Sequence, residues 1–124
     1  MEQVVVDTDV VSFLMRGDTR GAPYATFLRD CRASVCFMTV AELRYGAFRA
    51  GWGPKRVDAM EQALKSYALL SLDDPTVWEF ARLAAELRRR GREQINRDDC
   101  WIAATARRHG LRLVTHNVRH FESI

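Results

Sequence analysis

Acidic and polar side chains follow several predicted strands of this chain or open the helices beside them. Asp7 follows the β-branched run QVVV, Glu42 and Asp99 lie in the first turns of two predicted helices, and Asn117 follows the last predicted strand. In an open parallel α/β sheet, ligands bind outside the carboxyl ends of the strands. Carboxylates that meet there raise one another's pKa, and a divalent cation removes that conflict. Oxygen ligands favour Mg²⁺ or Mn²⁺ over zinc, and such a cation suits phosphodiester hydrolysis.

Each of these acids also has a local explanation. Thr39 and Glu42 have the spacing of a capping box. Asn96 is a good N-cap, which places Asp98 and Asp99 in the first turn of a helix, where acids offset the helix dipole. The helix of Asp99 leads into its strand rather than away from one, so spacing alone does not bring Asp99 to the crevice. The spacing leaves helix capping and cation binding both open.

Four further polar residues near these acids could belong to the same pocket: Thr8, Asp9, Ser12 and Thr115. Asp9 could share a face with Asp7 if the strand continues, because residues two apart in a strand point to the same side. The two hydroxyl groups close to Asp7 could hydrogen-bond in the pocket, and Thr115 could orient Asn117. Contacts within a local turn or cap are the alternative for each of them.

The elements that would position these residues alternate between strands and helices. Apolar β-branched runs predict strands at 3–6, 33–37, 68–72 and 111–115. Periodic apolar positions predict helices at 10–15, 23–32, from 39 to about 50, 55–67, from 74 into the basic stretch RRRGRE, and 97–109. This order predicts one α/β domain over residues 1–124, with a central, mostly parallel sheet of four to five strands flanked by helices.

Composition narrows the class of protein. No apolar run approaches ~18 residues, and the start MEQVVV has no basic leader, so neither a membrane span nor a signal peptide is expected. Three cysteines without close pairing predict a reducing compartment. Of 19 basic residues, all but Lys55 and Lys65 are arginine, whose planar fork matches phosphate. A net charge of +3 favours nucleic acid only slightly.

Four segments together resemble a known family. The segments VVVDTDVVSFL, TVAELRYG, DDCWIAATARRHGLRLVT and HNVRHF are similar to the successive signatures of PIN-domain ribonucleases, and most similar to the VapC-type toxins of type II toxin–antitoxin pairs. The similarity runs through essentially the whole chain, in order. It implies a metal-dependent endoribonuclease that cleaves structured RNA, either transfer or ribosomal, by a metal-activated water in the prokaryotic cytoplasm.

The resemblance also implies roles for individual residues. Asp7, Glu42 and Asp99 match the acids that hold Mg²⁺ or Mn²⁺ in the family, and Asp98 becomes a helix-start residue or a neighbour of the ligands. Asn117 departs from the pattern, since many members carry a fourth acid there. Its carbonyl oxygen could still bind the metal or orient a water, but it adds no charge, so a second ion should bind more weakly.

The implied partners are RNA, a tightly bound antitoxin and a second copy of the chain. Four arginines lie nearest to the motifs in sequence and are candidates for contacts with the RNA backbone: Arg16, Arg44, Arg97 and Arg119. Four apolar residues are candidates for an exposed groove or dimer face, with packing in the core as the alternative: Tyr45, Phe48, Trp52 and Met60.

Three other functions remain as alternatives. The chain could be a catalytically weak PIN-like module that binds RNA or protein. It could be a phosphatase with an aspartate nucleophile, because Asp7-Thr8-Asp9 follows the first strand as the Asp-x-Asp pattern does. The least favoured alternative is a zinc site built from Cys100, His109, His116 and His120.

Overall fold

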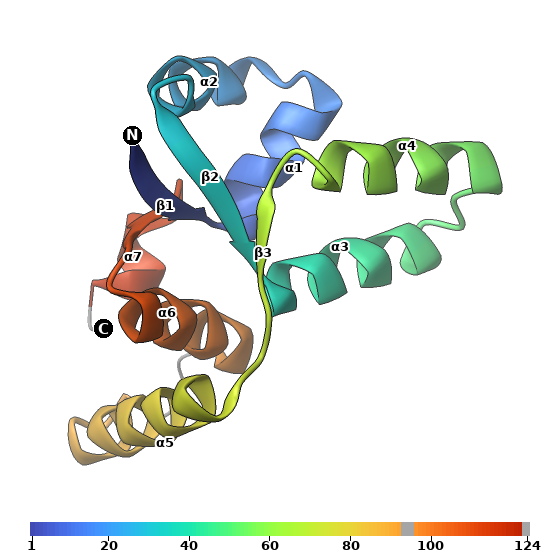
Figure 1. The fold of residues 1–124 in the computed structure, drawn as a ribbon. Helices are drawn as coiled ribbons and strands as arrows, with labels where there is room; N and C mark the ends of the chain where they lie inside the picture. The colour runs from blue at the N-terminus through green and yellow to red at the C-terminus, as the bar shows by residue number, and fades with distance from the viewer. Residues whose placement is uncertain (93–95, 123–124) are drawn as a thin grey trace.

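Four strands form a single parallel sheet at the centre of the protein. The structure, a computed structural model, describes residues 1–92 and 96–122 of the chain. Within that part the strands are β1 (Glu2–Val6), β2 (Cys31–Cys36), β3 (Ala68–Leu70) and β4 (Arg112–Val114). They lie in the order β3-β2-β1-β4, and every neighbouring pair is parallel (Figure 1). The predicted α/β class and the predicted sheet are therefore confirmed.

Helices cover both faces of this sheet. They are α1 (Thr8–Arg16), α2 (Ala22–Leu28), α3 (Phe37–Arg49), α4 (Pro54–Leu64), α5 (Asp74–Arg89), α6 (Arg97–His109) and α7 (Val118–Phe121), with a short 3₁₀ turn at Thr19–Gly21. Among the described residues no helix is long and apolar enough to cross a membrane. Glu93, the last residue of the predicted basic helix end, lies outside the described residues.

The alternation of side chains along β1 builds two cores. Val4 and Val6 pack with Val10 of α1 and with residues of α2 and α3, whereas Val5 faces the other side and packs with Ala106 of α6. The three valines of β1 are fully buried, and each such side chain stabilises the fold by about 1.5–3 kcal/mol. The central strand that carries Asp7 at its end is therefore held rigidly from both faces.

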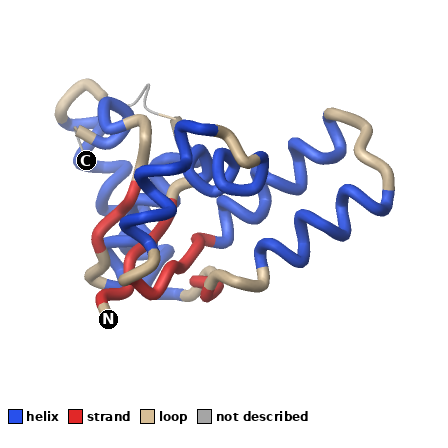
Figure 2. The backbone as a smooth tube through the Cα atoms, turned by 90° about the horizontal axis from the view of Figure 1, so that it is seen from above, coloured by secondary structure: helices blue, strands red, loops and turns tan. Residues whose placement is uncertain are grey.

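Helix α5 packs on the outside of α6. Leu83 and Leu87 of α5 form a buried cluster with Cys100, Ala103 and Ala104 of α6, and Figure 1 shows the two helices together on the side of the sheet away from α1 and α2. On the opposite side, α3 and α4 form a hairpin that projects from the body of the molecule (Figure 2).

Several predicted boundaries are wrong by a few residues. Helix α2 ends at Leu28 rather than at residue 32, because Cys31 already pairs with Glu2 in the sheet. Helix α3 begins at Phe37 rather than at Thr39, with Cys36 as its N-cap and the Cys36 thiol accepting from the Met38 amide. The predicted capping box is therefore not formed.

The order in which strands are added to the sheet reverses at β1. Strands β2 and β3 are added on one side of β1, and β4 is added on the other, which makes the β1–β4 edge a topological switch point where ligands bind. Helix α6 ends at Gly110, which adopts φ +64°, and the chain turns directly into β4. Because α6 runs antiparallel to β4, its first turn returns to the carboxyl edge of the sheet.

Candidate active site

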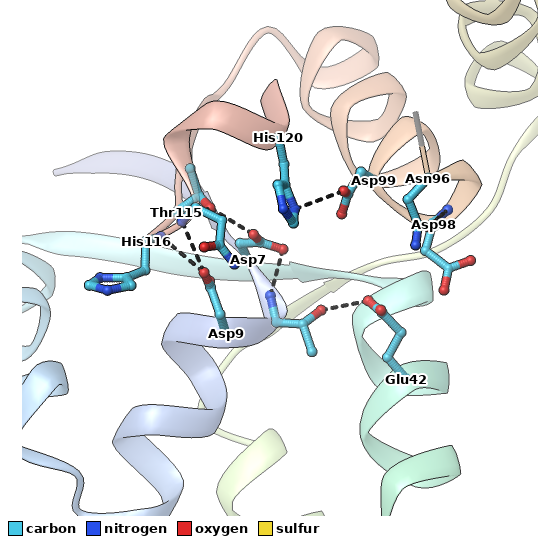
Figure 3. Close-up of polar contacts among 11 residues, drawn as sticks. Asp7, Asp9, Glu42, Asn96, Asp98, Asp99, Thr115, His116 and His120 are labelled. Carbon is cyan, nitrogen blue, oxygen red and sulfur yellow. Dashed lines mark hydrogen bonds and ion pairs between the residues drawn. The ribbon is translucent and has the colours of Figure 1, made fainter. Parts of the chain in front are cut away.

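A cleft of about 500 Å³ opens at the carboxyl edge of the sheet. Its walls include the three predicted carboxylates, Asp7, Glu42 and Asp99. Seven other polar or charged residues line it as well: Thr8, Asp9, Ser12, Arg16, Asn96, Asn117 and His120. Figure 3 shows most of these side chains converging from the ends of β1 and β4 and from the starts of α3 and α6. Asp99 lies in the first turn of α6, whereas Glu42 lies in the second turn of α3 and not in the predicted first turn, because α3 begins two residues earlier than expected. The three acids therefore line one pocket.

Asp7 is the most buried acid of the cleft, with only 5% of its surface exposed. It is the N-cap of α1, and its Oδ1 accepts a 2.8 Å hydrogen bond from the Thr8 amide. Its Oδ2 accepts a 2.7 Å hydrogen bond from the Thr115 hydroxyl. Burial raises the pKa of Asp7 to about 6, and the charges of Asp9 and Asp99 add to that rise against the two hydrogen bonds.

Glu42 points from α3 toward the start of α1. Its Oε1 accepts a 2.8 Å hydrogen bond from the Thr8 hydroxyl, whose oxygen lies 2.9 Å from the Thr39 hydroxyl. A hydroxyl has one hydrogen, so Thr8 donates to Glu42 and accepts from the fully buried Thr39. Burial raises the pKa of Glu42, and the negative charges of Asp98, Asp7 and Asp99 contribute. Glu42 thus serves the cleft and caps no helix.

Asp99 lies in the first turn of α6, as predicted. Asn96 is the N-cap, and its Oδ1 accepts from the Asp98 amide, so the helix start is satisfied without Asp99. The Asp99 carboxylate instead faces His120 of α7, with Nδ1 3.2 Å from Oδ2 (Figure 3). Burial raises the pKa of Asp99, and the nearby His120 opposes that rise. Asp98, which was predicted to be a helix-start residue or a neighbour of the ligands, lies in the first turn of α6, beside the cleft but outside its lining.

Asp9 does not share a strand face with Asp7, because β1 ends at Val6 and Asp9 belongs to α1. Its Oδ2 instead accepts hydrogen bonds from the backbone amides of His116 (3.2 Å) and Asn117 (3.1 Å). Thr115 Oγ1 also accepts from the Asn117 amide at 3.1 Å, as its predicted orienting role requires. Asp9 and Thr115 together hold the turn that presents Asn117 to the cleft.

The described part of the chain contains no group of three His, Cys, Asp or Glu side chains close enough together to hold one metal ion. The least favoured alternative, a zinc site, therefore finds no support: His116 contacts Tyr24 and Phe13, whereas His120 contacts Asp99. The acids of the cleft face Thr8, Thr115 and His120 instead of one shared point. Their donor set nevertheless fits a hard divalent cation, because it offers three carboxylates and an amide oxygen in one cleft.

The other predicted surface residues divide between the cleft and its surroundings. Arg16 lines the cleft, whereas Arg44 is bound to Glu61 through two hydrogen bonds of 2.8 and 3.3 Å. Arg97 lines a separate hollow, and Arg119 lies on α7. Tyr45 and Phe48 are exposed at 66% and 87%, as an apolar face requires, whereas Met60 is buried and Trp52 is half-buried.

Sequence reasoning missed the roles of His120, which lines the cleft, and of Thr39, which lies outside its lining. His120 was considered only as a zinc ligand, and its contact with Asp99 joins residues 21 apart that no local pattern links. Thr39 was considered only as a cap, although it supports the Thr8–Glu42 hydrogen bond from a fully buried position. The sequence marked these two residues only through the motifs that contain them, TVAELRYG for Thr39 and HNVRHF for His120.

The sequence model of the PIN domain matches residues 4–124. The chain belongs to the PIN domain family. Ribonuclease VapC2 of Haemophilus influenzae is a relative with 29% identity over 126 residues, an alignment that covers all of this chain and 93% of the relative. The tRNA(fMet)-specific endonuclease VapC of Shigella flexneri is 27% identical over 124 residues, again covering all of this chain and 93% of the relative.

Solved PIN-domain structures share the fold. The DNA-bound VapBC structure from Salmonella typhimurium superposes with a TM-score of 0.85 at 28% identity, over 98% of this chain and 92% of that chain. VapBC-1 from nontypeable Haemophilus influenzae gives a TM-score of 0.83 at 28% identity, over 97% of this chain and 90% of that chain. The family and the fold expected from the four motifs are both confirmed.

The phosphatase alternative gains no support from this PIN-domain site. Asp7, its candidate nucleophile, is buried and caps α1. Asp9, the second acid of its pattern, is engaged by the backbone amides of His116 and Asn117. A PIN-like binding module would differ from a nuclease in activity and not in fold, so an RNA cleavage assay distinguishes the two.

Proposed function

We propose that this PIN-domain chain is a Mg²⁺- or Mn²⁺-dependent endoribonuclease and the toxin of a toxin–antitoxin pair. The observation that carries the proposal is the gathering of Asp7, Glu42 and Asp99, from three separate elements, in one cleft where burial raises the pKa of each. Like charges placed together in a cleft are a costly arrangement whose usual reason is function. A divalent cation bound among them removes that cost.

In this proposal some side chains bind the cation, and others hold the cation's ligands in place. Asp7, Glu42 and Asp99 would hold Mg²⁺, with the amide oxygen of Asn117 as a neutral addition. When bound, Mg²⁺ supplies a Lewis acid that lowers the pKa of a water molecule and offsets negative charge on the phosphate oxygens. Thr115 orients the Asp7 carboxylate and Thr8 orients that of Glu42, so both acids are set before substrate arrives.

The substrate is RNA, and the names of the relatives support this class. Ribonuclease VapC2 and the tRNA(fMet)-specific endonuclease VapC both align over the whole of this chain, including the segments that bear the acids. We extend the proposal to structured RNA, transfer or ribosomal, as the target. The acidic cleft repels phosphate until a cation is bound, so a bound cation should strengthen the binding of RNA at the acids.

An antitoxin is the proposed regulatory partner, and the α3–α4 hairpin offers a place for it. A hollow of about 210 Å³ lies between these helices, and its lining shares Ala47, Trp52 and Met60 with the active-site cleft. A partner segment seated on this hollow and on the exposed Phe48 would lead directly to the acids. The VapBC complexes with the same fold support such a partner. A homodimer and action in the prokaryotic cytoplasm complete the proposal.

The direct test is cleavage of total RNA by purified, partner-free protein in Mn²⁺ or Mg²⁺, with EDTA as the control. We expect discrete fragments with metal and none with EDTA. Asp99→Asn should lower the cleavage rate at least about a hundredfold, since even changes next to a metal ligand cost 10- to 100-fold. Asp98→Asn is the matched control, because the same change one residue away lies outside the cleft lining.

The outcomes separate the candidate functions. Equal losses in the two asparagine variants would assign both acids to the start of α6 rather than to chemistry. Folded protein that cleaves no RNA with either metal would favour the binding module over the nuclease. Cleavage that persists in EDTA would contradict the metal but leave the nuclease in place.

A further inference from the structure

We infer that a second hollow, between α5 and α6, binds the RNA strand beside the scissile phosphate; this inference rests on the proposed ribonuclease function. The hollow has a volume of about 390 Å³. Its lining consists of three arginines and an apolar wall: Arg88, Arg92, Arg97, Phe80, Ala84, Ala85, Leu87 and Cys100. Among the described residues no acidic side chain lines it, in contrast to the active-site cleft.

The first turn of α6 separates this hollow from the active-site cleft. Asn96 and Asp99 line the cleft, whereas Arg97 and Cys100 of the same turn line the hollow. Alternate residues of one helical turn therefore face two adjoining sites of opposite charge. A nucleic-acid strand with one phosphate at the acids can cross this turn and place the next part of its backbone among the arginines.

Two of the three arginines of the hollow, Arg92 and Arg97, are available for a ligand. Within residues 1–92 and 96–122, neither Arg92 nor Arg97 forms an ion pair, and both are exposed. Arg44, the candidate beside α3, is instead occupied by Glu61, and Arg16 lies 3.5 Å from Asp18. The guanidinium fork matches a phosphate with two parallel hydrogen bonds.

The apolar wall distinguishes a nucleotide from a simple anion. Phe80 lines the hollow and is held in place by stacking on Trp101, with ring centroids 3.9 Å apart and an interplanar angle of 13°. Ala84 and Ala85 leave the neighbouring wall open. A base or ribose next to the scissile phosphate can pack on this wall while its phosphate meets the arginines, which is how single strands are commonly held.

Binding of a labelled single-stranded RNA, followed by fluorescence anisotropy in EDTA across a salt series, tests the inference without cleavage. We expect Arg92→Gln combined with Arg97→Gln to weaken binding about tenfold at low salt. The slope of the salt dependence should fall by about 1.4, or about 0.7 for each of the two phosphates that the variant no longer neutralises. Arg29→Gln with Arg32→Gln is the matched control. It removes the same two charges from exposed positions at the opposite end of the sheet, and should leave both quantities nearly unchanged.

Two more variants separate charge from shape. Arg92→Lys combined with Arg97→Lys should keep the salt dependence while weakening binding, because the charge remains and the fork is removed. Ala85→Phe should weaken binding with no change in salt dependence, because it fills the hollow without removing charge. Circular dichroism and thermal unfolding of each variant identify any loss of fold.

Three results would overturn the inference. The first is equal weakening of RNA binding by the Arg92/Arg97 and Arg29/Arg32 variants, and the second is no binding of RNA by the wild type at low salt. The third is displacement of the RNA by polyglutamate with the same dependence on Arg92 and Arg97, which would assign the hollow to an acidic protein. RNA that binds as expected but is never cleaved with metal would instead contradict the proposed nuclease and leave the binding surface standing.

Discussion

The hydroxyl of Thr115 donates a 2.7 Å hydrogen bond to Oδ2 of Asp7. The residue after the last strand therefore supports the carboxylate that follows the first strand, across the β1–β4 pair where the sheet reverses its order. This hydrogen bond lowers the pKa of Asp7 against the effect of burial. It favours the ionised form, which is the form that binds a cation.

Removing this hydrogen bond should raise the pKa of Asp7 further. Thr115→Val keeps the shape of the side chain and removes its donor, so we expect a rise of about one unit, the value of a hydrogen bond to a charged group. Carboxyl carbon NMR titration of metal-free protein measures it. Thr115→Ser retains the hydroxyl and serves as the control. An unchanged pKa in the valine variant would show that Thr115 supports the loop and not the carboxylate.

The raised pKa of Asp7 predicts a pH-dependent gain in stability for Asp7→Asn in metal-free protein. The pKa is about 6 in the folded state against an ordinary value of 3.8, so native Asp7 is destabilising once it ionises, and this cost grows between about pH 4 and pH 6. Above that range the variant should gain on the order of 2 kcal/mol, and below about pH 4 nothing. Asparagine also retains an oxygen to cap α1.

Thermal unfolding at two pH values measures the effect. We expect Asp7→Asn to raise Tm by several degrees at about pH 7.5 and to match the wild type at about pH 4. Asp58→Asn, an exposed aspartate on α4, is the control and should change Tm little at either pH. A variant less stable than the wild type at the higher pH would contradict the electrostatic account of the cleft.

The placement of the three cleft acids could be predicted because strand ends and helix starts are local patterns. The run before Asp7 is continuous and β-branched, and parallel strands must end at one edge, so Asp7 and Glu42 were expected to meet. Asp99 was harder, because its helix leads into β4. The first turn of α6 reaches that edge only because α6 runs antiparallel to β4. The family motif predicted the place of Asp99 at the cleft, whereas the spacing did not.

The contacts between these elements could not be predicted in the same way. Thr8 reaches Glu42 across 34 residues, and Asp9 reaches the Asn117 amide across 108. No sequence period links positions so far apart, so capping was the nearest available explanation for each residue. The start of α3 was missed for a related reason, since a cysteine thiol is not among the preferred N-caps.

The contact between His120 and Asp99 predicts that His120 competes with metal for the Asp99 carboxylate. His120 Nδ1 lies 3.2 Å from Asp99 Oδ2, on a side chain that is largely exposed. Exposed pairs contribute about 0.2–1 kcal/mol, so His120→Gln should strengthen Mn²⁺ binding by roughly 1.5- to fivefold. Isothermal titration calorimetry measures the affinity. His116→Gln is the control, because the His116 ring contacts Tyr24 and Phe13 rather than an acid. Weaker Mn²⁺ binding in the His120 variant alone would show that His120 supports the site.

We expect Asp9 to stabilise the turn after β4 through hydrogen bonds rather than to bind the metal. One of its oxygens accepts from the amides of both His116 and Asn117, so Asp9→Asn can keep both hydrogen bonds while Asp9→Ala loses them. We expect faster amide hydrogen exchange at these two residues in the alanine variant only, by roughly five- to tenfold for a loss of about 1 kcal/mol. RNA cleavage should follow the same order, with Asp9→Asn close to the wild type. If asparagine abolished cleavage while leaving exchange at the two amides unchanged, Asp9 would have to serve the chemistry through its charge.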